Sequence, residues 1–362
     1  MESTQLTQFS KAVTTAPTAK TSTTLVTPKV DKTGVNTKRG TQNVSTQFSQ
    51  ADGNTSLLTT ISPIKQPVSK PFIYLIQTEH CLPSQLNSSK DIGYETTCKC
   101  DVVVLSYRTP CLEPKPSHIS YVFVEGSWSL GRNMLYFTAM NRTPGYKYYI
   151  FLDDDIELRF NSFTPQEMKK LTPFRAFEEW LLDYQPAVGI ADELGSQGAA
   201  SILKERSLKC GIKEASMVIP TAYFDARFNA FHRNAIEHIL PYPTKYDKDS
   251  WWASQLHVIC SVELKFRGQA LMFVPVTVTN PQHRGYPRSA QNFNAQARAF
   301  VEEIQSKAPA VYHNRTLFDK LKNSLFSEYT TVQADTYCMN VTRRYPIVPY
   351  SHFDQNYQPK KF

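Results

Sequence analysis

Three consecutive carboxylates, Asp153, Asp154 and Asp155, follow a strongly apolar stretch that ends at Leu152. Two carboxylates separated by one residue can face the same divalent cation. Mn²⁺ or Mg²⁺ prefers such hard oxygen ligands and shares its remaining positions with substrate phosphates. Because adjacent carboxylates repel one another, something cationic must offset the cost of bringing them together. The triplet therefore indicates a metal site, and the alternative is a solvated acidic turn after a buried strand.

Apolar runs on both sides of the triplet predict the elements that position it. Before it, strands are expected at 72–76, 101–106, 118–124 and 146–152, and a helix at 131–141. After it, helices are expected at 173–184, 231–240 and 251–264, and strands at 187–191, 216–228 and 269–279. This order predicts an α/β domain with a mostly parallel sheet. Ligands bind at the carboxyl ends of strands in such sheets, where the triplet lies.

A longer pattern surrounds the triplet. Gly131-Arg132-Asn133 opens the expected helix, a turn at Gly145 follows, and the next strand delivers Leu152 and the triplet. In order, spacing and residue type, residues 101–158 resemble the nucleotide-sugar half of GT-A-fold glycosyltransferases, especially the family-2-like group. The resemblance implies a GT-A-like α/β fold, with a mostly parallel mixed sheet flanked by helices. It also implies a nucleotide-sugar donor, expected to be a UDP-sugar.

The resemblance further implies roles for individual residues. Asp153 would lie near the ribose and the metal, and Asp155 would be the main metal ligand. Glu125 stands where the family usually has Asp, at the end of the strand 118–124. The full donor-binding set is expected to be Ser106, Tyr107, Arg108, Glu125, Arg132, Asn133, Asp153 and Asp154.

Downstream, the family has a loop that leads to an acidic residue serving as the base, and residues 246–252 resemble it. A carboxylate at a helix N-terminus, followed by aromatic rings on which a sugar can stack, suits a general base aimed at an acceptor hydroxyl. We expect Asp249 to be this base, with Asp247 as the second candidate. The alternative is a helix N-cap, in which Asp249 or Ser250 only satisfies free backbone N–H groups.

The family also has a late histidine on the metal. Residues 280–285 follow the last expected strand, and His283 matches that position. A neutral imidazole is a suitable additional ligand for a carboxylate–metal site. The expected metal ligands are therefore Asp153, Asp155 and His283, and the alternative for His283 is an ordinary polar loop residue.

Together these residues predict a metal-dependent glycosyltransferase of the hexosyl- or N-acetylhexosaminyl-transferase type. Direct displacement at the anomeric carbon would invert its configuration. The sequence lacks the Q-x-x-R-W signature of processive sugar polymerases, so a single transfer is expected. Two alternatives stay open. One is a phosphatase of the haloacid-dehalogenase type, and the other is an inactive glycosyltransferase-like protein that binds carbohydrate.

Charge and composition divide the chain. Residues 1–70 are crowded with Thr, Ser, Gln and Lys, and their eight basic and three acidic side chains account for +5 of the net charge of +8. We expect this segment to be a disordered stem or linker. The remainder would form a catalytic domain at 71–300, with its nucleotide-sugar half at 99–157 and its acceptor half at 158–300, and a C-terminal extension at 301–362 that packs on it.

The small charge left on the folded part argues against a nucleic-acid partner. The expected partners are a nucleotide-sugar and a glycan, glycoprotein or glycolipid acceptor, and the sequence does not predict an oligomeric state.

Cysteines and glycosylation sequons indicate an oxidising compartment. The spacing Cys98-x-Cys100 does not fit a zinc knuckle, so disulfides are expected, with one thiol left over and Cys260 a small buried hydrophobe. The seven cysteines are Cys81, Cys98, Cys100, Cys111, Cys210, Cys260 and Cys338. Sequons begin at Asn43, Asn54, Asn87, Asn141, Asn314 and Asn340. We expect the Golgi or ER lumen, with membrane attachment only through an anchor that this sequence does not contain.

Overall fold

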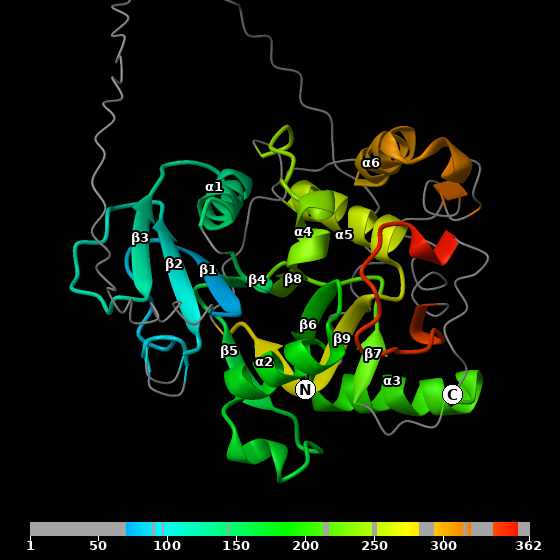
Figure 1. Ribbon diagram of the computed structural model, residues 1–362, viewed down its shortest axis with the longest axis horizontal. Helices are drawn as coiled ribbons and strands as arrows, with labels where there is room; N and C mark the ends of the chain where they lie inside the picture. The colour runs from blue at the N-terminus through cyan, green and yellow to red at the C-terminus, as the bar shows by residue number, and fades with distance from the viewer. Residues whose placement is uncertain are drawn as a thin grey trace, which may run out of the picture. The chain divides into compact units, whose positions relative to one another are not determined.

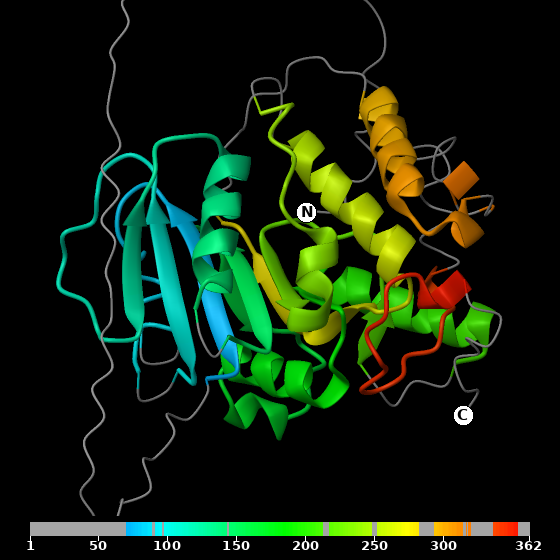
Figure 2. The same ribbon diagram turned by 45° about the horizontal axis from the view of Figure 1, so that its top comes forward.

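A nine-stranded mixed sheet with helices on both faces forms the described part of the protein (Figures 1 and 2). The computed structural model describes residues 70–88, 91–95, 98–142, 145–212, 217–247, 252–281, 293–313, 316, 318–319 and 336–353. All of these residues belong to one unit of the chain. Within the same ranges, no helix is both long enough and apolar enough to cross a membrane.

The strands lie in the order β3-β2-β1-β4-β8-β6-β9-β5, and β7 pairs with β9. The first four strands in the chain are β1 (Phe72–Thr78), β2 (Cys100–Ser106), β3 (Ile119–Phe123) and β4 (Tyr148–Asp153). They are followed by β5 (Glu157–Phe160), β6 (Val188–Asp192), β7 (Val218–Pro220), β8 (Phe228–His232) and β9 (Ala270–Thr279).

Strand direction brings several strand ends to one edge of the sheet. β1 is parallel to β2 and to β4, and β2 is parallel to β3. β8 is antiparallel to both β4 and β6, so β6 runs in the same direction as β4, and β9 is parallel to β6. The C-terminal ends of β1, β2, β4, β6 and β9 therefore share one edge, which we call the carboxyl edge. The chain enters β8 at this same edge.

Helices cover both faces of the sheet because alternate strand residues point to opposite sides. On one face, α1 (Trp128–Met140) packs on β1 and β2, α4 (Arg233–Ile239) packs on β4 and β8, and α5 (Trp252–Phe266) packs on β9. On the other face, α2 (Pro173–Tyr184) buries Phe177 and Trp180 against the sheet. Two further helices are α3 (Gly195–Cys210), which packs on β9, and α6 (Phe293–Lys307), which packs on α5 (Figure 2).

Two helices begin where a side chain accepts a hydrogen bond from a free backbone N–H group of the first turn. Ser127 caps α1, because its side chain accepts a hydrogen bond from Leu130 N at 3.2 Å. Thr172 caps α2 in the same way, and Pro173 occupies the first turn, where no N–H is needed. The turn before β4 uses Gly145, whose φ of 82° is the left-handed region that favours glycine.

The predicted fold class is confirmed as an α/β fold, with a mixed sheet flanked by helices. Its N-terminal half is parallel and its C-terminal half is mixed. The single strand expected at 216–228 is wrong, because β7 ends at Pro220 and a turn precedes β8. The helix expected at 231–240 begins only at Arg233, and α1 begins three residues earlier than expected because Ser127 caps it.

The disulfide prediction is also confirmed. Disulfides join Cys81 to Cys111, Cys98 to Cys100 and Cys210 to Cys338. Cys260 remains a buried thiol, and burial raises its pKa to about 12. Described residues near the C-terminus bond to the sheet domain, since Tyr350 N donates to Lys265 O at 2.7 Å.

His232 makes stability depend on pH. Its Nδ1 accepts a hydrogen bond from Asn234 N at 3.2 Å at the start of α4, and burial lowers its pKa from 6.5 to about 4. Because the pKa is lower in the folded state than in the unfolded state, this histidine contributes its full stability above pH 6.5. That contribution is lost as the pH falls toward 4. His232→Asn keeps a capping acceptor without titrating. Between pH 7 and pH 4, the free energy of unfolding measured in urea should fall by roughly 2 kcal/mol more for the wild type than for this variant. Equal losses would contradict the assignment.

Candidate functional site

Asp153 stands at the middle of the carboxyl edge. It ends β4, pairs in register with Gln77 of β1, and its backbone N donates to Arg227 O at 2.9 Å. The predicted donor side, formed by the ends of β1 and β2, therefore lies on one side of Asp153. The ends of β8 and β6 lie on the other.

Arg132 supplies the positive charge that the triplet needs. Its side chain is fully buried, and Nη2 forms an ion pair with Asp153 Oδ1. The guanidinium lies 5.0 Å from the ring centroid of Trp128 and 5.6 Å from that of Phe151, so aromatic faces support the buried cation. Gly131 lets α1 approach this closely, because a Cβ there would collide with the Gln77 side chain.

Several other carboxylates act on Asp153. Burial raises the pKa of Asp153 from 3.8 to about 6; Arg132 opposes this rise, and Asp225, Asp155 and Asp154 add to it. Asp225 thus acts on Asp153 more strongly than the sequence neighbours do. Carboxylates that act on one another in this way are the electrostatic condition that favours binding of a cation.

Asn133 connects α1 to the loop before α5. Its Nδ2 donates to Tyr242 O at 2.8 Å, and Tyr242 N donates to its Oδ1 at 2.7 Å. Both ends of the amide are thus bonded to main chain. The structure gives Asn133 a positioning role next to Arg132, and its expected contact with the donor stays a prediction.

Ser106, Tyr107 and Arg108 of the expected donor-binding set lie two strands from Asp153, with β1 between. Ser106 is buried at the end of β2, and its hydroxyl donates to Val122 O at 3.4 Å. Tyr107 and Arg108 both contact Glu79, whose Oε1 lies 3.2 Å from Arg108 Nη2. Glu125 is exposed beyond β3 at the far margin of the sheet. Gln77 and Glu79 are the residues that sequence reasoning missed here, and the central position of β1 is what places them in the site.

Asp247 is fixed by two hydroxyl groups. Its Oδ2 accepts from Ser127 Oγ, and its Oδ1 lies 3.3 Å from Ser254 Oγ. Since Ser127 caps α1, Asp247 links the loop before α5 to the helix that carries Arg132. The candidate base Asp249 and the candidate metal ligand His283 lie outside the described residues.

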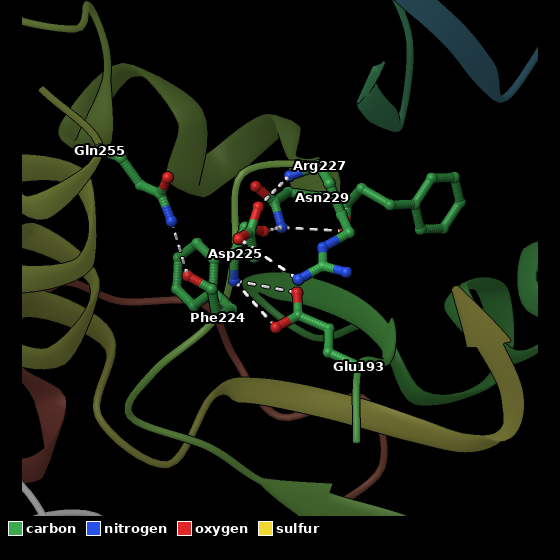
Figure 3. A network of polar contacts seen from close by, with 7 residues as sticks. Glu193, Phe224, Asp225, Arg227, Asn229 and Gln255 are labelled. Carbon is green, nitrogen blue, oxygen red and sulfur yellow. Dashed lines mark hydrogen bonds and ion pairs between the residues drawn. The ribbon is translucent and has the colours of Figure 1, made fainter. Parts of the chain in front are cut away.

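A second polar cluster lies beside Asp153 and was not predicted (Figure 3). Asp225 N donates to both carboxylate oxygens of Glu193, at 2.9 and 3.0 Å, and Asp225 Oδ1 accepts from Arg227 N at 2.9 Å. Arg227 Nη2 lies 3.4 Å from Asp225 Oδ2. The acidic end of the expected strand 187–191 was a usable signal for Glu193. Asp225 was hidden because it fell inside the strand expected at 216–228.

The described residues leave a metal site at the triplet incomplete. In these ranges, Cys81, Cys111 and Glu113 are the one group of three whose potential ligand atoms lie within 4.8 Å of one another, and two of them form a disulfide. The end of β9 lies close to the triplet, however, because Thr279 pairs with Glu157 just after Asp155. Thr279, the last residue of β9, lies four residues before His283, and its partner Glu157 lies two residues after Asp155.

No family model and no curated protein matches this chain. Among solved structures, it is similar to TarS of S. aureus. Residues 1–349 of TarS give 11% identity and a TM-score of 0.37, covering 71% of this chain and 73% of that one. The same TarS fragment in complex with UDP gives 10% identity and a TM-score of 0.40, covering 72% of each chain. A longer TarS structure gives 12% identity and a TM-score of 0.39, and the match covers 72% of this chain and 44% of that one. Likenesses this remote carry no conclusion about ligand or chemistry.

Asn133 offers a direct test of how α1 is held. Asn133→Ala leaves Tyr242 N and Tyr242 O without side-chain partners, so it should destabilise the protein by about 2–3 kcal/mol in chemical denaturation. Asn141→Ala, at the exposed end of the same helix, is the matched control and should change stability by less than about 0.5 kcal/mol. Similar effects for the two variants would show that the Asn133 amide does not anchor α1.

Proposed function

We propose that this protein is a metal-dependent glycosyltransferase that moves a sugar from a nucleotide-diphosphate donor, a UDP-sugar, to an acceptor hydroxyl. The observation that carries the proposal is the position of the triplet. Asp153 and Asp155 lie at the carboxyl edge of a GT-A-like sheet, where Asp154 and Asp225 add their charges beside the guanidinium groups of Arg132 and Arg227. Such a cluster favours a divalent cation, and a bound cation favours a diphosphate ligand.

The cation would be held by Asp153, Asp155 and His283. When bound, Mn²⁺ or Mg²⁺ supplies Lewis-acid stabilisation of the departing diphosphate. Arg132 keeps Asp153 oriented through its ion pair, and Ser106, Tyr107 and Arg108 line the edge on the donor side. The pairing of Thr279 with Glu157 supports a role for His283, since Thr279 lies four residues before His283 and Glu157 lies two residues after Asp155.

On the acceptor side, Asp249 is proposed as the base that removes the proton of the attacking hydroxyl. Asp247 is less suited to this role, because Ser127 and Ser254 already bind its two oxygens. Attack opposite the leaving diphosphate gives inversion and a single transfer.

We also propose a secretory-pathway location in the ER or Golgi lumen. Disulfides persist in such oxidising compartments. The three disulfides and the exposed sequon residues Asn87 and Asn141 support it.

Isothermal titration with UDP and Mn²⁺ tests the proposed function. The wild type should bind UDP only when Mn²⁺ is present, and Asp155→Ala should weaken that binding about 100-fold or more, because it removes a direct metal ligand. Asp183→Asn is the matched control, since Asp183 lies on α2 and pairs with Arg343. Metal-independent UDP binding, or equal affinity in Asp155→Ala and Asp183→Asn, would contradict the proposal.

A further inference from the structure

Asp225 and Arg227 occupy the carboxyl edge on the side of Asp153 that faces away from β1. β8 is antiparallel to β4, so the residues that enter β8 stand beside those that leave β4. The bond from Asp153 N to Arg227 O, at 2.9 Å, fixes this neighbourhood. With the donor expected along β1 and β2, the pair lies where an acceptor would approach the same centre.

The turn that carries the pair is held from three sides. Glu193 accepts from Asp225 N with both oxygens, and Asn229 Nδ2 donates to Asp225 O at 2.7 Å. Asp225 Oδ1 accepts from Arg227 N at 2.9 Å (Figure 3). These bonds fix the backbone of residues 225–227, and among the described residues Asp225 Oδ2 has one long contact, to Arg227 Nη2 at 3.4 Å.

A turn before a strand does not require this arrangement. Burial and the charge of Asp225 raise the pKa of Glu193 well above its usual range, so holding the turn with a carboxylate is costly. The charged ends of the pair nevertheless stay accessible: the Asp225 side chain is 34% exposed and that of Arg227 is 27% exposed. Binding sites typically have this arrangement, in which buried hydrogen bonds hold the backbone rigid while the charged side chains stay accessible.

Tyr242 gives a second, independent indication. Its side chain is buried, and its hydroxyl has no hydrogen-bond partner among the described residues. Arg132, Asp153 and Asp225 are the charged groups that act on its pKa, which burial raises to about 12. The Tyr242 ring lies 5.1 Å from that of Trp128, the ring that also faces the Arg132 guanidinium, so a bound polar ligand or water on this side of the site would complete the bonding of the hydroxyl.

The pair presents an acceptor atom beside a donor group. A carboxylate oxygen accepts from one hydroxyl, and a guanidinium N–H donates to a neighbouring one. Two adjacent hydroxyls on a sugar ring match this arrangement, whereas a serine or threonine side chain offers only one. We propose that Asp225 and Arg227 bind the acceptor through two neighbouring hydroxyls, so the acceptor is a carbohydrate. Glu193 is the positioning residue for this pair. The inference rests on the proposed glycosyltransferase function.

Two reactions separate acceptor binding from donor chemistry. One is release of UDP from UDP-sugars with Mn²⁺ and no added acceptor, in which water attacks. The other is transfer to methyl hexosides, compared with transfer to Ser- and Thr-containing peptides. In Asp225→Asn, the KM for the methyl hexoside should rise about 10- to 100-fold, because one hydrogen bond to the acceptor changes. At saturating Mn²⁺, UDP release to water should stay within about twofold of wild type, and more Mn²⁺ should be needed to reach saturation because Asp225 no longer adds its negative charge near Asp153.

Arg227→Lys, which keeps the charge but loses the planar fork, should raise the same KM and leave UDP binding intact. Glu193→Ala should also raise the KM for the methyl hexoside and leave UDP binding intact. Glu193→Gln should bring this KM most of the way back to the wild-type value, because its amide oxygen still accepts a hydrogen bond from Asp225 N. Asp183→Asn is the control that should change neither reaction. Retained UDP affinity shows in each case that the variant is folded.

Transfer to peptides but not to methyl hexosides would overturn this inference, as would an unchanged KM in both Asp225→Asn and Arg227→Lys. Loss of UDP binding in Asp225→Asn would also overturn it, by making Asp225 part of the donor site. These outcomes leave the proposed function standing. A wild type that does not bind UDP with Mn²⁺ overturns the proposed function, and this inference with it.

Discussion

Repulsion between carboxylates at the carboxyl edge is the constraint on which the site depends. Asp154 and Asp155, which follow Asp153 in the sequence, and Asp225, which precedes β8, repel the negative charge of Asp153. The buried guanidinium of Arg132 offsets part of this repulsion, because it forms an ion pair with Asp153 and packs against two aromatic rings. Arg227, which pairs with Asp225, is a second guanidinium beside these carboxylates. A site in which carboxylates repel one another gains from binding a further cation.

Much of the surrounding structure serves to keep Arg132 in place. Gly131 lets α1 lie against Gln77, Asn133 ties the helix to the backbone of Tyr242, and Asp247 binds the residue that caps the helix. The last two contacts come from the segment that leads into α5, in the acceptor half of the chain. The position of the donor-side cation thus depends on residues more than 100 positions away in sequence.

The sequence predicted the parallel half of the fold well and the polar contacts poorly. Apolar runs at 72–76, 101–106 and 146–152 are continuous, so the strands and the position of the triplet at a strand end could be read directly. Asp225 could not, because apolar residues from Val218 to Phe228 suggest one strand where a turn lies. α3 was missed because its described side chains bury little apart from Ala199 and Arg206. The partners of Asn133 and Asp247 depend on tertiary packing, which no local pattern reports.

The central claim is that the carboxyl edge holds a divalent cation that in turn holds a nucleotide diphosphate. Electron paramagnetic resonance of Mn²⁺ tests it most directly, because the six-line signal of free Mn²⁺ disappears on binding. Adding the protein should remove part of that signal, adding UDP should remove more, and a variant with Asp153→Asn and Asp155→Asn should restore it under both conditions. An unchanged free-Mn²⁺ signal with the wild-type protein and UDP would contradict the claim.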